Sequence, residues 1–414
     1  MGHLAGTERP EVLLGPVVSK NAAMKYVICV PDGCADEPHP DLGGRTPLEV
    51  AKMPVLSALA ARGTVGRAAV IPEGMPPGSD VGNLSLLGYD PAVHHTGRAP
   101  IEAASLGIRI RPDQVAFRCN LSTVATDADH PDGVMADFAG GHPNSEDAAE
   151  VIKALDEQLG SGVGAEVSFH PGVQYRHIMV APESWAAADC IPPHDLTDSP
   201  AQWPTGPAGQ QLSELMKASR SVLEQFPQVS ANQIWLWGQG HQPELPSFQD
   251  TYGISAAMVT AVDLVRGLGV LTGMDVVQVE GATGWYDTNY EAKRDAAIAS
   301  LQGDTDLFVI HIEATDEAGH AGNLAEKVRA LENWDARVLA GLIPALDAMG
   351  DWRLLMSPDH ATPLLLKTHT STTVPYLIVD SKVDGSGGEY SESGTEQAEV
   401  VPGHELMSLL LQRT

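Results

Sequence analysis

Seven side chains with metal-binding or nucleophilic chemistry stand in four short stretches of this chain. They are Asp32, Ser79, Asp316, His320, Asp359, His360 and His369. Three carboxylates, three imidazoles and one hydroxyl would fill two divalent metal sites around one nucleophile. Paired ions neutralise charge on both the attacking and the leaving oxygen of a phosphoryl transfer. The set therefore predicts metal-dependent phosphoryl transfer with Ser79 as the nucleophile.

Each of these residues also has an ordinary structural interpretation. Asp32 before Gly33 is a common turn signal, and Ser79 is placed to cap a helix that runs from Asp80 to Leu87. A helix N-terminus also offers free N–H groups to a phosphate, which suits a nucleophile that becomes a phosphoserine. The recurrence of such residues near the ends of apolar runs favours the functional interpretation.

Four mainly apolar runs, the first of them containing β-branched residues, predict the strands that position these side chains. The runs are Lys25–Val30, Leu307–Ile312, Trp352–Met356 and Val374–Val379. Asp32, Asp316 and Asp359 follow the first three, as expected for ligands beyond the carboxyl ends of strands in an α/β sheet. Helical periodicity over residues 324–349 and a helix from Thr46 through Ala61 complete a doubly wound α/β core.

The middle of the chain has weaker strand patterns and contains none of the seven candidate ligands. We therefore expect a smaller α/β (α+β) domain at residues 115–245, inserted into a core made of residues 24–114 and 246–414. Residues 1–23 are expected to form an irregular N-terminal extension. The 414 residues are enough for two domains.

Composition limits the partners of this chain. The net charge of −29 argues against a nucleic acid or an anionic membrane surface. Four cysteines without a C-x-x-C pair indicate reduced thiols, and neither a signal peptide nor a membrane-spanning run is recognisable, so we expect a cytoplasmic protein. A phosphate site in so acidic a chain must rely on metal ions and on a few Arg and Lys side chains. The sequence leaves the oligomeric state open.

The sequence around the candidate ligands resembles that of the archaeal-type cofactor-independent phosphoglycerate mutases of the alkaline phosphatase superfamily. The resemblance rests on the order Asp, Ser, Asp-x-x-x-His, Asp-His, His and on longer flanking motifs. Those motifs are DGCAD at 32–36, GGRTPLE at 43–49, GSDVGNLSLLGYDP at 78–91, TGRAP at 96–100, GATG at 281–284, DTNY at 287–290 and the segment 311–320.

The resemblance implies an alkaline-phosphatase-like core with an inserted transferase domain and two metal sites. One ion would be held by Asp316, His320 and His369, and the other by Asp32, Ser79, Asp359 and His360. Ser79 would take the phosphoryl group from 3-phosphoglycerate and return it to O2 of the bound glycerate, without bisphosphoglycerate. We expect Mn²⁺, with zinc, cobalt or magnesium as alternatives, because imidazole ligands suit manganese or zinc better than magnesium.

A small phosphorylated three-carbon acid needs side chains that bind a phosphate and a carboxylate, which guanidinium groups do in bidentate fashion. Arg176, in Tyr175-Arg176-His177, is the leading candidate. The further candidates are His142, His177, Lys293, Arg98 and Arg118.

Two departures from the resemblance keep other reactions open. Phe138 stands where relatives often have an Arg, and residues 237–240 (WGQG) lack an Arg that some relatives carry. The alternative is another metal-dependent phosphotransferase, of the proposed homoserine kinase type, or a phosphohydrolase on the same core. A mutase must keep water from its phosphoserine, and a large inserted domain favours that reaction. A non-catalytic binding protein would lack ligands, and none of the seven is missing.

Overall fold

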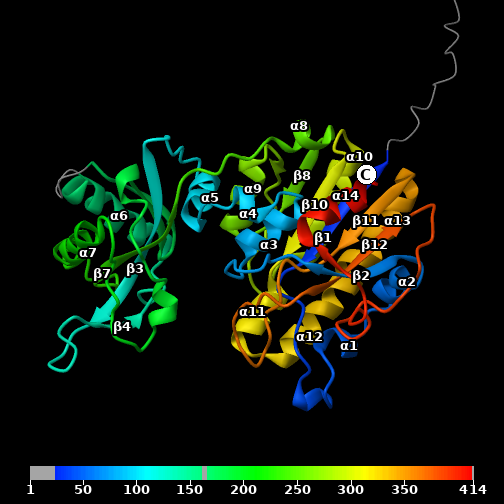
Figure 1. Ribbon diagram of the computed structural model, residues 1–414, viewed down its shortest axis with the longest axis horizontal. Coiled ribbons are helices and arrows are strands. Elements are labelled where there is room, and N and C mark those ends of the chain that lie inside the picture. The colour runs from blue at the N-terminus through cyan, green and yellow to red at the C-terminus, as the bar shows by residue number, and fades with distance from the viewer. Residues whose placement is uncertain (1–23, 161–165, 413–414) are drawn as a thin grey trace, which may run out of the picture.

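Two β-sheets that share no strand organise the structure, a computed structural model that describes residues 24–160 and 166–412 (Figure 1). The predicted N-terminal extension, residues 1–23, lies outside the described residues. The larger sheet has the strand order β13 (Val400–Pro402), β2 (Thr64–Ala69), β12 (Val374–Asp380), β11 (Trp352–Met356), β1 (Lys25–Pro31), β10 (Leu307–Ile312), β8 (Ala256–Val259) and β9 (Asp275–Val276). The smaller sheet has the order β4 (Val134–Asp137), β3 (Gln114–Ala125), β6 (Arg176–Pro182) and β5 (Ser168–Val173), with β7 (Gln233–Gly240) paired to β3.

Helices occupy most of the connections between these strands. They are α1 (Pro47–Val50), α2 (Pro54–Arg62), α3 (Ser79–Leu86), α4 (Pro91–His94), α5 (Arg98–Ser105), α6 (Ser145–Leu159), α7 (Gly209–Leu223), α8 (Phe248–Tyr252), α9 (Asp263–Leu271), α10 (Tyr290–Gln302), α11 (Ala314–Ala321), α12 (Leu324–Asn333), α13 (Ala340–Met349) and α14 (Leu406–Leu411). No helix in the described part of the chain is both long and apolar enough to cross a membrane.

Strand β1 is central to the larger sheet and fixes the position of the polar residues that follow it. It pairs in parallel with β10 on one side and with β11 on the other. Pro31 stands opposite Ile312, and Cys29 stands opposite Met356. Because all three strands run in the same direction, the segments that leave their carboxyl ends meet at one edge of the sheet.

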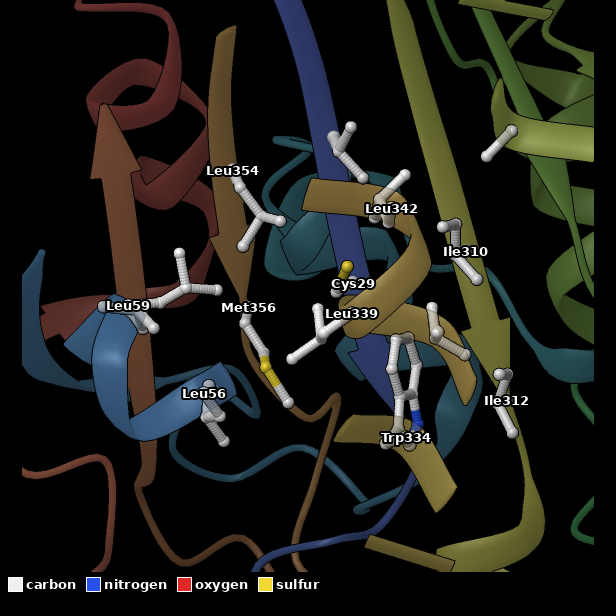
Figure 2. Close-up of a cluster of buried hydrophobic side chains, with 14 of the residues drawn as sticks. Cys29, Leu56, Leu59, Ile310, Ile312, Trp334, Leu339, Leu342, Leu354 and Met356 are labelled. Carbon is white, nitrogen blue, oxygen red and sulfur yellow. The ribbon is translucent and has the colours of Figure 1, made fainter. Parts of the chain in front are cut away.

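Hydrophobic side chains fill both faces of this sheet, as alternation along β1 requires. Val27 and Cys29 belong to a buried cluster under α2, α10, α12 and α13, whereas Ile28 and Val30 belong to a cluster under α3, α9 and α14. Figure 2 shows the first cluster, in which Trp334 lies among side chains of β1, β10 and β11. The predicted doubly wound α/β core is confirmed.

The strand predictions at 25–30, 307–312, 352–356 and 374–379 are confirmed within one residue at each end. The single helix predicted from Thr46 through Ala61 is wrong, because the chain leaves α1 after Val50 and starts α2 at Pro54. Proline has no N–H to donate inside a helix but is well suited to a helix's first position. The periodic segment 324–349 is helical throughout, with a π-helical turn at Trp334–Leu339 between α12 and α13.

The smaller sheet has its own core and stands beside the larger sheet (Figure 1). Its strands are antiparallel, and α6 and α7 contribute Val151, Leu155, Leu212 and Leu215 to the buried cluster. Helix α5 lies between the two sheets, packing Ala99 and Ala103 on β3 and β6 and also contacting α9. The predicted boundaries at residues 115 and 245 stay a prediction.

Candidate metal centre

The candidate ligands come from three connections that leave the central strands of the larger sheet. Asp32 follows β1, Asp316 lies in α11 just after β10, and Asp359 follows β11. All three carboxylates are buried, with exposed fractions of 2%, 8% and 0%. Buried carboxylates need a partner of opposite charge, so this edge of the sheet is a place for cations.

One group of donors consists of Asp316, His320 and His369. Asp316 and His320 are one helical turn apart in α11, and His320 Nε2 lies 3.3 Å from Asp316 Oδ2. His369 Nε2 lies 3.5 Å from Asp316 Oδ1 and 2.9 Å from His320 Nε2. Two imidazole nitrogens that face each other beside one carboxylate have the convergence expected of ligands to a common ion.

The second group consists of Asp32, Asp359 and His360, with Ser79 beside it. His360 Nε2 lies 3.4 Å from Asp32 Oδ1 and 3.6 Å from Asp359 Oδ2. Ser79 Oγ lies 3.2 Å from the same nitrogen. His360 Nδ1 pairs with Thr362 Oγ1 at 3.1 Å, which fixes the ring and turns Nε2 toward the carboxylates.

His360 lies between the two groups. One of its ring nitrogens is close enough to Asp316 and His369 to form a second possible ligand set with them, and the rings of His360 and His369 have centroids 4.1 Å apart. The seven residues singled out in the sequence therefore meet at a single site, in which His360 is common to both halves.

Glycines in the same motifs allow the ligand segments to approach one another. A Cβ on Gly82 of α3 would lie 1.8 Å from the carbonyl oxygen of Asp359, so α3 packs directly on the ligand loop. Gly33 has a φ of +59°, and a Cβ there would lie 2.5 Å from Asp316 Oδ1. A Cβ on Gly319 would lie 2.5 Å from the Thr362 carbonyl oxygen. The three short motifs are thus also packing motifs.

The electrostatics of the site indicate missing positive charge. Burial, with the Asp359 and Asp316 carboxylates, raises the pKa of Asp32 well above its usual value. Asp32 Oδ1 is buried and has no hydrogen-bond partner. Burial opposes ionisation of Asp316 as well, but hydrogen bonds from His320 and His369 hold its pKa well below the usual value. A buried, unpartnered carboxylate oxygen beside an imidazole nitrogen fits a divalent cation.

Ser79 is the first residue of α3 rather than its cap. Gly78 precedes the helix without a side-chain capping bond, and the whole of α3 is buried. The Ser79 hydroxyl is therefore free to face His360 at the start of α3, where backbone N–H groups have no helical partner. The interpretation of Ser79 as a mere N-cap is wrong.

Three residues that contact the candidate ligands, and a fourth that anchors one of the three, were not singled out in the sequence. Asn83 donates to Asp359 Oδ2 at 2.6 Å, and Thr362 Oγ1 donates to Asp316 Oδ1 at 2.5 Å. His311 Nε2 lies 3.4 Å from Asp32 Oδ2, and its Nδ1 pairs with Glu313 Oε1 at 3.1 Å. A histidine inside the otherwise apolar run LFVIHI was the one available signal for this pair.

A cavity of about 530 Å³ joins the metal centre to the smaller sheet. His320, His369 and Asp80 line it on one side, and Arg98, His194 and Trp237 line it on the other. The cavity is large enough for a small organic acid.

Four of the six candidate substrate-binding residues line a second, smaller cavity of about 50 Å³: Arg98, Arg118, Arg176 and His177. Glu102 Oε1 lies 3.3 Å from Arg98 Nε and 3.1 Å from an Arg118 terminal nitrogen. Burial lowers the pKa of His177 to about 3, and its Nε2 is buried without a partner. Arg98 lines both cavities, so the guanidinium groups lie next to the space beside the metal centre.

The other two candidates lie elsewhere. His142 is exposed and packs edge-on against Tyr175, with ring centroids 5.3 Å apart. Lys293 is fully buried, and its Nζ donates to Glu313 Oε2 at 2.7 Å and to the His311 carbonyl at 3.0 Å. Its ammonium group is thus already paired within the core, away from both cavities.

Comparisons with known proteins agree on one family. Residues 60–228 match the 2,3-bisphosphoglycerate-independent phosphoglycerate mutase family. A probable 2,3-bisphosphoglycerate-independent phosphoglycerate mutase of Geobacter sulfurreducens is 43% identical over 405 residues, covering 94% of this chain and all of that protein.

Two solved structures resemble this one over most of its length. The PH0037 protein from Pyrococcus horikoshii has a TM-score of 0.74 and 26% identity, with 94% of this chain and 97% of that chain covered. The cofactor-independent phosphoglycerate mutase from Thermoplasma acidophilum has a TM-score of 0.58 and 25% identity, with 94% and 99% covered.

Proposed function

The chain belongs to the 2,3-bisphosphoglycerate-independent phosphoglycerate mutases, and we propose that it interconverts 3-phosphoglycerate and 2-phosphoglycerate through a phosphoserine at Ser79. The observation that carries the nucleophile assignment is the 3.2 Å approach of Ser79 Oγ to His360 Nε2, inside the group of buried acidic and imidazole side chains. As the family name states, 2,3-bisphosphoglycerate is not needed.

Two divalent ions fit the donor set. Asp316, His320 and His369 would hold one, and Asp32, Asp359, His360 and Ser79 would hold the other, with His360 also close enough to Asp316 and His369 to serve the first ion. Manganese is favoured among the metals. When bound, such ions lower the pKa of a coordinated hydroxyl and neutralise charge on the transferring phosphoryl group.

The reaction has two half-reactions that mirror each other. In the first, Ser79 Oγ forms a bond to phosphorus, the bond from phosphorus to O3 of the substrate breaks, and the serine proton ends on that oxygen. The glycerate then turns within the cavity. In the second half, O2 bonds to phosphorus, the Oγ–phosphorus bond breaks, and the O2 proton returns to the serine.

The chain's own residues must hold the glycerate and exclude water between these steps. We propose that residues 115–245 form the substrate-binding part, with Arg118, Arg176 and His177, and that Arg98 of α5 connects it to the metal centre. The guanidinium groups of Arg98 and Arg118 lie over the Trp237 ring, 5.9 and 4.8 Å from its centroid. A substrate carboxylate bound by Arg98 and Arg118 would thus contact guanidinium groups that pack on Trp237. Arg98 also lines the cavity beside the metal centre, toward Ser79.

The alternative reactions are separated by one set of assays on the purified full-length protein. After EDTA treatment and addition of Mn²⁺, Zn²⁺ or Mg²⁺, 3-phosphoglycerate is supplied without bisphosphoglycerate, and 2-phosphoglycerate is detected by enolase coupling. Metal-dependent product formation is expected, together with a phosphoryl adduct on the Ser79 peptide. Release of inorganic phosphate alone would favour a hydrolase, and phosphorylation of homoserine from ATP would favour the kinase alternative.

Ser79→Ala tests the nucleophile directly. The variant should lose turnover and the phosphoryl adduct while keeping its fold by circular dichroism, because the serine side chain fills no structural role at the cap of α3. Turnover close to that of the unmodified protein would contradict the assignment.

A further inference from the structure

His311 is a buried imidazole that the proposed mechanism does not use. It lies in β10 with no exposed surface, and its Nε2 is 3.4 Å from Asp32 Oδ2 and 3.9 Å from Asp359 Oδ2. It therefore lies beside the two carboxylates of the proposed Asp32 metal site, on the side of strand β10.

The other side of the His311 ring is anchored by a chain of buried groups. Glu313 Oε1 lies 3.1 Å from Nδ1 and also accepts the Ala261 N–H at 2.9 Å. Glu313 Oε2 accepts from Lys293 Nζ, which also donates to the His311 carbonyl oxygen. Because Nδ1 faces Glu313, Nε2 lies on the other side of the ring, toward Asp32 and Asp359, with the Asn83 amide nitrogen 3.5 Å away.

The contacts of Asp32 show what this arrangement does. Oδ2 faces His311, whereas Oδ1 has no hydrogen-bond partner and lies 3.4 Å from His360 Nε2. Asp32 Oδ2 thus lies against His311, whereas Asp32 Oδ1 faces the other candidate ligands. Asp359 is held in a similar way, since Gly33 N–H donates to its Oδ1 at 3.2 Å and Asn83 donates to its Oδ2.

We infer that His311 is a positioning residue, anchored by Glu313 and Lys293, that fixes the Asp32 and Asp359 carboxylates for the ion at the Asp32 site. The inference rests on the proposed two-ion site. It also gives Lys293 a role behind the metal centre in place of the predicted contact with the substrate. Residues that orient metal ligands change metal affinity by about 10-fold to 100-fold when they are replaced.

The experiment measures Mn²⁺ binding to metal-free full-length protein by equilibrium dialysis. His311→Ala should bind one of the two ions at least about 10-fold more weakly, while the ion at Asp316, His320 and His369 keeps its affinity. His311→Gln, whose amide can still donate to Asp32, should recover part of the loss. Arg353→Met is the matched control, because it removes a buried ion pair with Asp380 (Nε–Oδ2 2.7 Å) at the opposite end of β11.

Affinity of His311→Ala within twofold of the unmodified protein for both ions would overturn the inference. If that variant does not fold, Glu313→Gln takes its place, and unchanged Mn²⁺ binding there would overturn the inference equally. A mutase assay separates this result from the proposed function. Protein that shows the expected Mn²⁺ dependence on His311 but does not isomerise 3-phosphoglycerate would refute the reaction and leave the positioning role intact.

Discussion

Ser79 Oγ lies 3.2 Å from Nε2 of His360, although 281 positions separate these residues in the chain. The contact exists because α3 packs on the loop that follows β11, and His360 is held there by Thr362. His360 in turn reaches donors of both halves of the site. The hydroxyl is therefore placed beside the one ligand that is shared between the two proposed ions.

His360→Ala should consequently affect both ions, whereas His320→Ala should affect one. Removing His360 takes a donor from both sets, while His320 contacts only Asp316 and His369 among the ligands. Metal content after dialysis against a limiting Mn²⁺ concentration distinguishes the two variants. His404→Ala, on the short turn before α14, provides a control that should retain two ions. Equal metal loss in His360→Ala and His320→Ala would contradict the shared position of His360.

Arg118 and His142 were both candidate substrate-binding residues, and the structure predicts different consequences for them. Arg118→Met removes a buried guanidinium from the small cavity, so KM for 3-phosphoglycerate should rise about 10-fold or more, as expected for a lost charge-assisted contact. His142→Asn should change KM by less than about twofold, because His142 is exposed and lines neither cavity. Asn is chosen because the φ of residue 142 is +51°, which Asn tolerates. A larger increase in KM for the His142 variant than for the Arg118 variant would show that the substrate binds near His142 and not in the small cavity.

The convergence of the candidate carboxylates could be predicted from the sequence because Asp32, Asp316 and Asp359 each come soon after a recognisable strand. LFVIHI and the other apolar runs predicted buried strands, and the parallel sheet places Asp32, Asp316 and Asp359 at one edge. The break in the helix at Pro54 could also have been read from the sequence, since proline disrupts a helix interior.

The partners of Lys293 could not be predicted in the same way. Its burial depends on Glu313, which lies in a different element and is itself held by Ala261 N–H. A single lysine or arginine in a sequence does not indicate whether its side chain will pair with a buried carboxylate in the core or bind a substrate in a cleft. The pairing of β7 with β3, more than 100 positions apart, was hidden for the same reason: no local pattern records a partner at long range.

Glu392 should make the stability of the protein depend on pH. Burial raises the pKa of Glu392 to about 7, although it accepts hydrogen bonds from Thr46 Oγ1 and Asp36 N–H. A raised carboxyl pKa means that the folded state favours the protonated form, so this contribution to stability is present at low pH and is lost as pH rises from about 4.5 to about 7.

Glu392→Gln keeps an acceptor for Asp36 N–H and cannot ionise. Its melting temperature relative to the unmodified protein should therefore increase between pH 4.5 and pH 7, and stay constant above that range. Glu389→Gln, three positions earlier in the same segment, is the control and should show no such trend. A difference in melting temperature between the Glu392→Gln variant and the unmodified protein that stays constant from pH 4.5 to pH 7 would contradict the raised pKa of Glu392.

Gly82→Ala tests whether contact between α3 and the ligand loop controls metal binding. Alanine would improve helix propensity by about 1 kcal/mol, but its Cβ would lie 1.8 Å from the Asp359 carbonyl oxygen, which forces one of the two backbones to move. Overpacking of this kind costs about 1–3 kcal/mol, so the clash should outweigh the propensity gain and lower the melting temperature. Mn²⁺ affinity should also fall, because the backbone that faces Gly82 belongs to Asp359, a proposed ligand. Gly267→Ala is the matched control: its Cβ would lie 1.9 Å from the Ile101 carbonyl oxygen, between α9 and α5. It should lower the melting temperature by a similar amount while leaving Mn²⁺ affinity unchanged. Equal Mn²⁺ affinity in the two variants would show that Asp359 does not depend on α3 for its position.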